Sequence, residues 1–335
     1  MPELPEVETL RRDLQRAVVG RTITEARVAP DAPRLVQEMP VDVFTTGLRG
    51  RRIDGIARRG KYLLIRLSAE AATDPSPSTP PPPSPPRSAQ DDTSGLWWVV
   101  HRRMSGNLIH RAAGAPDEPY LRARFRLDDG NELRFIDLRK FGTMWLTDDP
   151  QAVVAALGPE PLDDAFTVET LAAVLAKRSA PVKAVLLDQT AIAGLGNLYA
   201  DEALHYASVH PLRPANGLTP DEVACLRDSI VRALEQGLAN LGSSIGYADG
   251  EEVSLRDHVN LSGEAGGNQE YLVAYGREGR PCRTCGTPIE RLKLSNRSAH
   301  FCPRCQPRAI LKRKRSRAKA KKATKAKATR TAETS

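Results

Sequence analysis

The chain has 335 residues, 40% of them hydrophobic and 27% charged, with a formal net charge of +8. This length can form two or three domains, and the lack of an eighteen-residue apolar run argues against a membrane span. The first thirty residues alternate charged and apolar positions, unlike a secretory signal, so we expect a cytoplasmic protein. The Lys and Arg residues between Arg308 and Arg330 carry more positive charge than the net charge of the whole chain, so the rest of the chain is close to neutral. Any nucleic-acid footprint on that remainder must come from local clusters.

The opening segment predicts a helix that begins near Pro5 and ends before Gly20. Proline suits a first helical turn, and glycine suits the position just past a helix end. The apolar residues that recur about once per helical turn are Val7, Leu10, Leu14 and Val18. They form a single stripe, so we expect the helix to pack on the core by that face.

Pro2 is not explained by this helix, and it becomes the N-terminal residue if Met1 is removed. A free α-amine has a pKa of about 7.7–8.0, so on the order of a tenth of it is nucleophilic near pH 7. A proline nitrogen carries one hydrogen, so its condensation with an aldehyde carbon gives an iminium that cannot lose its charge. Such an iminium is an electron sink for breaking neighbouring bonds, and Glu3 would lie beside it. The alternative interpretation is a tolerated N-terminus.

Residues 22–67 predict β-strands, and residues 69–95 predict a disordered, proline-rich insertion at a loop tip. Residues 96–101 predict the next strand, and the turn signal at 128–131 predicts a hairpin of 121–127 with 132–136. Arg122, Arg124 and Arg126 share one face of that hairpin, either as a solvated sheet face or as a phosphate-facing surface. A turn that leaves the strand at 96–101 is expected at 101–107, and an exposed turn at 137–142. The segment thus predicts a β domain with one helix packed on it.

From about Gln151 the pattern changes to helices, predicted at 168–178, 181–188, 197–207 and 220–240. Two glycines, Gly194 and Gly196, precede a helix that Asn197 would cap. Such a turn either offers backbone N–H groups to a phosphate or is a plain turn between helices. Residues 242–267 predict a mobile loop, and residues 271–279 a short strand.

The cysteines give the strongest local signal. Four of the five form two Cys-x2-Cys pairs, and without a secretion signal this spacing predicts a four-thiolate zinc site rather than disulfides. The predicted ligands are Cys282, Cys285, Cys302 and Cys305. Four thiolates close the coordination shell, so we expect one structural Zn²⁺ that supports a hairpin over residues 289–301, with Lys293 and Arg297 at its tip. Cys225 is expected to be a small buried apolar residue.

These motifs together resemble the formamidopyrimidine-DNA glycosylase family over roughly residues 1–68 and 96–306. The motifs are Pro2-Glu-Leu-Pro-Glu-Val-Glu-Thr9, Arg59-Gly-Lys-Tyr62, Met104-Ser-Gly106, Arg139-x-Phe-Gly142, Leu157-Gly-Pro-Glu-Pro-Leu162, Asp188-Gln189, Gly194-Leu-Gly-Asn-x-Tyr-x-x-Glu202, Tyr275-Gly-Arg-Glu-Gly279 and the four cysteines. The resemblance implies an α+β multidomain fold. It comprises an N-terminal β-sandwich with an N-terminal helix (1–147), a helix–two-turn–helix domain (148–267), a zinc-finger hairpin (268–306) and a disordered basic tail (307–335).

The resemblance also implies a repair reaction on double-stranded DNA that contains oxidised bases. Oxidised purines, chiefly 8-oxoguanine and formamidopyrimidines, would be removed and the strand then cut at the abasic site. The Pro2 nitrogen would attack C1′ of the flipped nucleotide, and Glu3 would protonate the opening sugar. Lys61 matches the lysine assigned to β-elimination and phosphate contact. Arg297 matches the arginine assigned to δ-elimination and phosphate binding.

Further residues match the family's DNA contacts. Met104, Arg139 and Phe141 match the three that fill the gap left by the flipped nucleotide, although core packing would also suit Met104 and Phe141. Arg178, Lys183 and Asn197 match phosphate contacts. Tyr120 replaces a histidine that commonly contacts DNA.

The chain departs from the family in its turn after residue 101. His101-Arg-Arg-Met-Ser-Gly106 stands where the family often has His-Leu-Gly-Met-Ser-Gly, and the two arginines either strengthen contact with the DNA backbone or change the turn.

We expect a monomer, associated with the nucleoid and with no membrane partner.

Two alternatives remain open at this point. One is an endonuclease VIII-like enzyme for oxidised pyrimidines. The purine branch is favoured over it by Leu4 and Val7 of the opening segment, by Met104 and by the Arg139-x-Phe141 pair. The other is a non-catalytic zinc DNA-binding protein, which would predict the loss of Pro2, Glu3 or Lys61.

Overall fold

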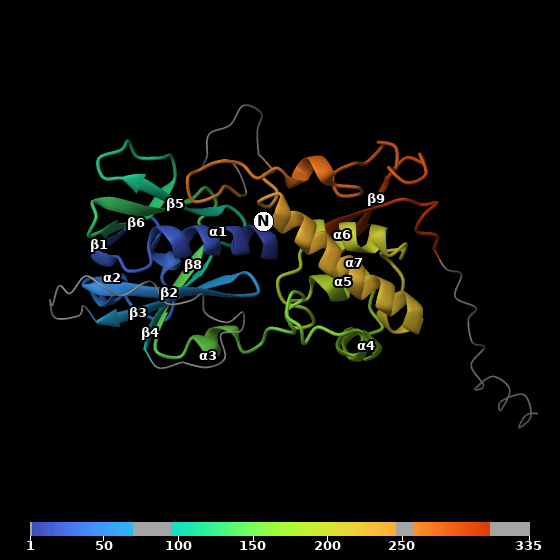
Figure 1. Ribbon diagram of the computed structural model, residues 1–335, viewed down its shortest axis with the longest axis horizontal. Coiled ribbons are helices and arrows are strands. Elements are labelled where there is room, and N and C mark those ends of the chain that lie inside the picture. The colour runs from blue at the N-terminus through green and yellow to red at the C-terminus, as the bar shows by residue number, and fades with distance from the viewer. Residues whose placement is uncertain (1, 70–94, 246–257, 309–335) are drawn as a thin grey trace, which may run out of the picture.

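The computed structural model describes residues 2–69, 95–245 and 258–308, which form two lobes (Figure 1). Met1, residues 70–94 of the predicted insertion, residues 246–257 of the predicted loop and the tail beyond residue 308 lie outside the described residues. The first lobe consists of α1 (Leu4–Ala17), β1 (Thr22–Val28), η1 (Pro33–Leu35), α2 (Val41–Leu48), β2 (Arg51–Arg59), β3 (Tyr62–Ala69), β4 (Leu96–His101), β5 (Gly106–Ala112), β6 (Leu121–Leu127), β7 (Asn131–Asp137) and β8 (Thr143–Thr147).

The second lobe is mainly helical. It consists of α4 (Val168–Ala176), α5 (Val182–Leu187), α6 (Asn197–Tyr206), η2 (Ala215–Gly217), α7 (Pro220–Ala239), η4 (Asn268–Tyr271), β9 (Glu290–Leu294) and β10 (Arg297–Phe301). The short helix α3 (Pro150–Val154) precedes them and packs on the sheet of the first lobe through Val154. The four predicted helices correspond to α4, α5, α6 and α7, with ends that differ by one or two residues. Among the described helices, none is long and apolar enough to cross a membrane.

The strands of the first lobe form one antiparallel sheet in the order β5-β7-β6-β1-β2-β3-β4-β8. In a flat sheet the four steps from β4 to β6 would span about 19 Å. The rings of Trp98 in β4 and Phe125 in β6 are nevertheless 4.3 Å apart, so the sheet folds back on itself around a shared core. Register shifts in the β1–β6, β2–β3 and β6–β7 pairs supply local bends. The sandwich prediction is confirmed in the form of one folded sheet.

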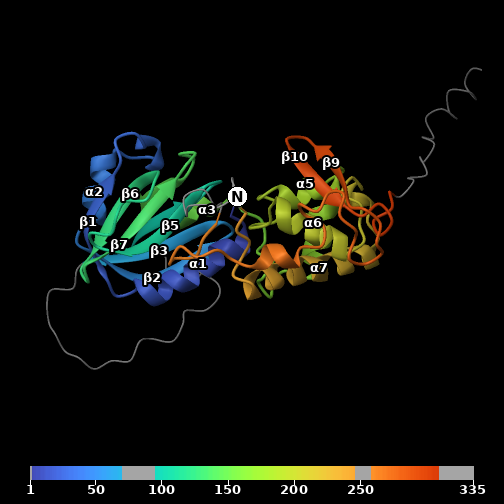
Figure 2. The same cartoon turned by 90° about the horizontal axis from the view of Figure 1, so that it is seen from above.

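Helix α1 joins the two lobes. Its predicted stripe, from Val7 to Val18, is at most 1% exposed and packs in the core of the sheet. Its first residue, Leu4, instead belongs to the core of the helical lobe, and the Leu4 N–H donates to the carbonyl of Gly194 at 3.0 Å. The N-terminal end of the chain therefore lies at the junction of the lobes, as Figures 1 and 2 show.

Helix α2 lies within residues 22–67, where the sequence predicts only strands. Its sequence is rich in β-branched residues and contains Gly47, which is unfavourable for a helix by propensity. Burial of Phe44 and Leu48 on one face overrides that preference.

The β9–β10 hairpin confirms the prediction for residues 289–301, with Arg297 paired to Leu294 beside the turn. Figure 2 shows this hairpin next to α5 and α6. The strand expected at 271–279 is wrong. The backbone N–H groups of Val273, Ala274 and Tyr275 all donate to the carboxylate of Glu202, at 2.8–2.9 Å, so they do not join a sheet.

Candidate active site

Glu3 is held at the start of helix α6, 195 residues away in the chain. Its carboxylate accepts hydrogen bonds from the backbone N–H groups of Leu198, at 2.9 Å, and Tyr199, at 3.3 Å. These N–H groups lack partners within a helix, and the helix dipole favours an anion there. The turn before α6 thus does receive an anion, and in this structure the anion is the Glu3 carboxylate.

Two glycines make this approach possible. A Cβ atom at Gly196 would lie 2.4 Å from the Glu3 carboxyl carbon, and one at Gly194 would lie 2.7 Å from the Leu4 side chain. Gly194 also has a φ of +83°, which disfavours other residues. The expected cap by Asn197 is wrong, because Gly196 occupies the N-cap position and Asn197 is the first residue of the helix.

Glu6 reinforces the position of Glu3. Its carboxylate accepts the Glu3 N–H at 2.8 Å, which completes a capping box at the start of α1. It also accepts the Tyr199 hydroxyl at 2.7 Å and the Ser243 N–H at 2.8 Å. Burial, followed by the nearby Glu3 charge, raises the pKa of Glu6 to about 7. Glu6 thus joins α1, α6 and the segment after α7.

Lys61 lies at the tip of the β2–β3 turn and is only 5% exposed. The preceding Gly60, with a φ of +55°, donates its N–H to the carboxylate of Glu160, which holds the tip against the second lobe. Burial lowers the pKa of Lys61, the charges of Glu3 and Glu6 oppose that effect, and Arg297 adds to it. These mutual influences place the Lys61 amine in the electrostatic field of the same site.

Arg297 begins strand β10 at the tip of the hairpin and is exposed. It lines one small pocket with residues from α1, α6 and the segment after α7. The lining residues are Glu3, Glu6, Asn197, Leu198, Ser243, Ile245, Tyr275 and Arg297. The side-chain oxygen of Asn197 is buried with no hydrogen-bond partner in the described structure, which leaves this acceptor available to a ligand.

Asp137 brings the three expected gap-filling residues together. Its buried carboxylate accepts the Ser105 hydroxyl at 2.5 Å, the Arg139 N–H at 3.1 Å and the Gly142 N–H at 2.8 Å. It therefore fixes both the turn that carries Met104 and the turn that carries Arg139 and Phe141.

Phe141 is 49% exposed, which excludes the alternative of core packing for this residue. The Arg139 guanidinium lies 4.9 Å from the centre of the Phe141 ring. Met104 is half-buried. The two turns therefore present an apolar ring, a cation and a methionine near one another.

Three other expected contacts are placed away from the pocket. Tyr120 is 39% exposed with a φ of +64°, and the Arg122 guanidinium lies 5.7 Å from its ring. Arg178 is half-buried and pairs with Asp188 at 3.7 Å. The arginines of β6 are in ion pairs with Asp31, Asp117, Glu25 and Glu132, which favours the sheet-face interpretation over the phosphate-facing one.

The expectation that Lys183 contacts a phosphate is corrected by its environment. Its amine is fully buried, 2.6 Å from the Asp201 carboxylate and 2.6 Å from the Ser298 carbonyl. Asp201 in turn accepts the backbone N–H of His300 at 2.9 Å. Lys183 and Asp201 thus join α5 and α6 to strand β10. Satisfied and buried in this way, the amine positions the hairpin that carries Arg297 and does not reach a surface ligand.

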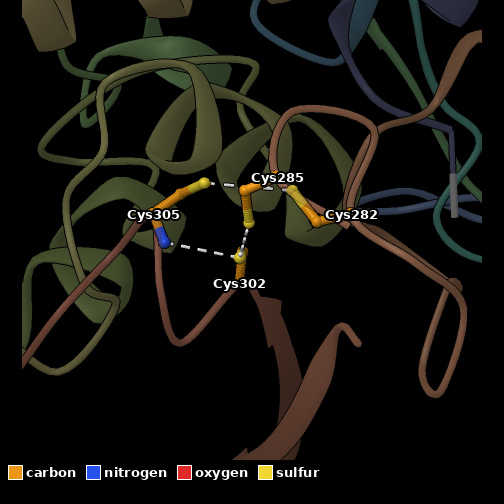
Figure 3. Close-up of side chains that lie close together, drawn as sticks. All are labelled: Cys282, Cys285, Cys302 and Cys305. Carbon is orange, nitrogen blue, oxygen red and sulfur yellow. Dashed lines mark hydrogen bonds between the residues drawn. The ribbon is translucent and has the colours of Figure 1, made fainter. Parts of the chain in front are cut away.

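The four predicted zinc ligands converge from two loops (Figure 3). Their sulfur atoms all lie within 4.8 Å of one another, with Cys282 and Cys305 at 3.9 Å and Cys285 and Cys302 at 3.4 Å. A tetrahedral site with Zn–S bonds of about 2.3 Å requires sulfur separations of about 3.8 Å, so the arrangement fits Zn²⁺. Four thiolates leave no open position, which makes the metal structural. Cys225, by contrast, is exposed on α7, so its expected burial is wrong.

Some residues of the site carry no role in the sequence predictions. Glu6 stands three residues after Glu3, which is the spacing of a capping box and could have indicated it. Asp137 begins the turn motif that contains Arg139, but its role depends on Ser105, which is distant in the chain. No sequence signal indicates that Ser243 and Ile245 line the pocket.

Comparisons with known proteins place these features in a family. The chain matches the models for the formamidopyrimidine-DNA glycosylase N-terminal domain at residues 1–144, the H2TH domain of the same proteins at 157–249, and the zinc finger found in FPG and IleRS at 279–308. It is 44% identical over 297 residues to the formamidopyrimidine-DNA glycosylase of Moorella thermoacetica, covering 88% of this chain and 95% of the relative.

Solved structures agree with these matches. A complex of Lactococcus lactis Fpg with DNA containing an abasic site has a TM-score of 0.75 and 32% identity, covering 91% of this chain and all of the other. A complex of wild-type Lactococcus lactis Fpg (MutM) with DNA containing N7-benzyl-Fapy-dG has a TM-score of 0.75 and 33% identity, covering 92% of this chain and all of the other. The chain therefore belongs to the formamidopyrimidine-DNA glycosylase family, with the fold, the DNA glycosylase class and the structural zinc site that its sequence motifs predict.

Proposed function

We propose that this chain excises oxidised purines from duplex DNA, with Pro2 as the nucleophile, and then cleaves the strand at the resulting abasic site. One observation carries the proposal: Glu3, the neighbour of Pro2, is fixed in the same pocket as Arg297. The Lactococcus lactis complexes with abasic and Fapy-dG DNA support this lesion class for a chain of the same fold. The mechanism requires removal of Met1, which lies outside the described residues.

The first step would replace the glycosidic bond. The Pro2 nitrogen donates its lone pair to the sugar C1′, and the electrons of the bond between C1′ and the base leave with the base. Loss of the N–H proton from the attached amine restores the lone pair of the Pro2 nitrogen, and the departing base takes up a proton. That lone pair forms the iminium between the Pro2 nitrogen and C1′ as the bond between C1′ and O4′ breaks, and Glu3 gives a proton to O4′. Glu3 is suited to this role because its carboxyl group is oriented by two backbone N–H groups beside the amine.

The second step would cut the strand. The iminium draws electrons from the C2′–H bond, so a base removes that proton and the C3′–O bond breaks, releasing the 3′ phosphate. A further elimination breaks the C5′–O bond and releases the 5′ phosphate. Lys61 and Arg297 are the cations of this site, and phosphate contact by them would favour departure of the leaving groups.

A lesion panel tests the proposal against its alternatives. Duplexes with 8-oxoguanine, a formamidopyrimidine, an oxidised pyrimidine or an undamaged guanine would each be incubated with the protein and the products resolved by size and end group. We expect cleavage of the two purine lesions to leave a one-nucleotide gap with phosphates at both ends. Cleavage restricted to the oxidised pyrimidine would instead show an endonuclease VIII-like enzyme. Binding without any cleavage would show a non-catalytic DNA-binding protein.

The basic tail gives a separate prediction about affinity. Its Lys and Arg residues can release counterions from DNA, so a chain ending at Gln306 should bind undamaged duplex more weakly at low salt. The plot of log Kd against log salt concentration, measured by fluorescence anisotropy, should also be shallower for the shortened chain. Equal affinity and equal slope would contradict the prediction.

We further propose that the protein acts as a monomer in the cytoplasm, in association with the nucleoid. One chain contributes every group of the proposed mechanism, which supports a monomer. Sedimentation with and without duplex would test the stoichiometry.

A further inference from the structure

Arg102, one of the two arginines that depart from the family pattern, is buried rather than directed at solvent. It lies between β4 and β5 and is 1% exposed. Its Nε donates to the carbonyl of Gly106 at 2.7 Å, and one terminal nitrogen donates to the side-chain oxygen of Asn107. Its other terminal nitrogen lies 3.1 Å from Nδ1 of His258. This guanidinium thus connects the turn that carries Met104 to a residue in the segment between α7 and η4.

The contact with Arg102 defines the protonation state of His258. A guanidinium can only donate, so Nδ1 of His258 must accept, and the ring proton lies on Nε2. Nε2 is 3.2 Å from the carbonyl of Leu241, to which it donates. Burial, with a further contribution from Arg102, lowers the pKa of His258 well below its usual value, which agrees with a neutral ring.

His258 also connects to the wall of the pocket. Its carbonyl accepts the Ser244 hydroxyl, and Ser244 lies between Ser243 and Ile245, which both line the pocket beside Glu3. On its other side, the Val259 N–H donates to Asn107 at 3.3 Å, and the Leu261 carbonyl accepts the His110 N–H of β5 at 2.8 Å. The buried contact of Arg102 with His258, together with these two hydrogen bonds, therefore joins the pocket wall of the second lobe to the sheet of the first.

We propose that Arg102 is a positioning residue for lesion recognition, because it fixes the Ser243–Ile245 wall of the pocket relative to the Met104 turn. The inference rests on the proposed function and deepens it. A damaged nucleotide brings a base that must fit against this wall, whereas an abasic nucleotide brings none. Arg102 therefore contributes to the excision of a base and not to cleavage at a site that has already lost its base.

The test measures the variant Arg102→Leu on two substrates. Leucine is the residue that the family often has at this position. Single-turnover rates would be measured on an 8-oxoguanine:C duplex and on a preformed abasic site opposite C. Misplacement of a positioning group by about 1 Å can slow a reaction by about 100-fold, so we expect at least a tenfold slower excision of 8-oxoguanine. Cleavage at the abasic site should stay within about twofold of the unaltered protein, which also reports a folded catalytic site. Arg103→Gly is the matched control, since Arg103 is exposed with a φ of +55° that glycine adopts freely.

A second variant covers the case in which Arg102→Leu does not fold. His258→Leu removes the other half of the contact and should show the same selective loss. The double variant should be no slower than either single one, because both changes break one connection. Equal loss on both substrates, no loss on either, or additive effects in the double variant would overturn the inference. Failure of the unaltered protein to excise 8-oxoguanine would instead count against the proposed function.

Discussion

Replacing Glu3 with glutamine should slow base excision from an 8-oxoguanine duplex by about 10²–10⁴-fold, the usual range for loss of a general acid–base group. Glutamine keeps an acceptor oxygen for one of the two N–H groups, those of Leu198 and Tyr199, but cannot deliver a proton to the sugar as a carboxylic acid does. The rate would be measured under single turnover, with duplex affinity determined in parallel. Affinity should change little, because the lost group acts on the reacting sugar.

Glu25→Gln supplies the control for this experiment. It makes the same chemical change in strand β1, where Glu25 forms ion pairs with Arg27 and Arg126 and does not line the pocket. Its excision rate should equal that of the unaltered protein. If Glu3→Gln kept its rate within tenfold, Glu3 would not be the proton donor, and its placement at α6 would have only a structural role.

Removing the zinc ligand Cys302 by substitution with serine should loosen the placement of the β9–β10 hairpin and slow both excision and strand cleavage. Among the described residues, the buried apolar cluster beside this hairpin consists of Cys282, Ile289 and Cys302, and a two-stranded hairpin alone is marginal in water. Metal binding supplies about 10–16 kcal/mol in zinc-finger peptides, so the metal adds to the support that Lys183 and Asp201 give to strand β10. The two larger cores, which contain no residue of the hairpin strands, should remain folded.

Three measurements check this prediction. Zinc content should fall from one ion per chain towards zero, the main thermal transition should persist, and excision should fall by at least 10-fold, because a hydrogen bond to a charged group such as Arg297 contributes about 1.5–3 kcal/mol. Cys225→Ser is the matched control, since Cys225 lies exposed on α7 outside the cluster. Full activity of a zinc-free Cys302→Ser protein would show that the hairpin does not need the metal to place Arg297.

Local patterns in the sequence predicted much of the fold. The stripe of α1, the hairpin of β6 and β7 and the cysteine spacing each depend on neighbours within about twenty residues, and each is confirmed. The predictions for the segment of helix α2 and for residues 271–279 were wrong for different reasons. In α2, burial of two apolar residues outweighs an unfavourable propensity, and at 271–279 one buried carboxylate takes the N–H groups that a strand would have used.

The site itself was predictable only as a set of residues. The sequence motifs indicated Pro2, Glu3, Lys61 and Arg297, but not that Glu3 would lie at the N-terminus of α6. The motifs also could not distinguish a surface lysine from Lys183, whose counter-charge Asp201 is eighteen residues away and on another helix. Arg102 shows the same limit, since its partner His258 is 156 residues away and no local pattern joins them.

The central claim is that the Pro2 nitrogen forms the covalent intermediate. Its most direct test is reduction with borohydride during reaction on an 8-oxoguanine:C duplex, followed by mass spectrometry of the adduct. With Met1 removed, we predict a cross-link mapped to Pro2, most of which is lost in Pro2→Gly. A chain that retains an N-terminal tag should bind the duplex without forming the adduct. No adduct from correctly processed protein, or a cross-link mapped to Lys61 in place of Pro2, would contradict the account.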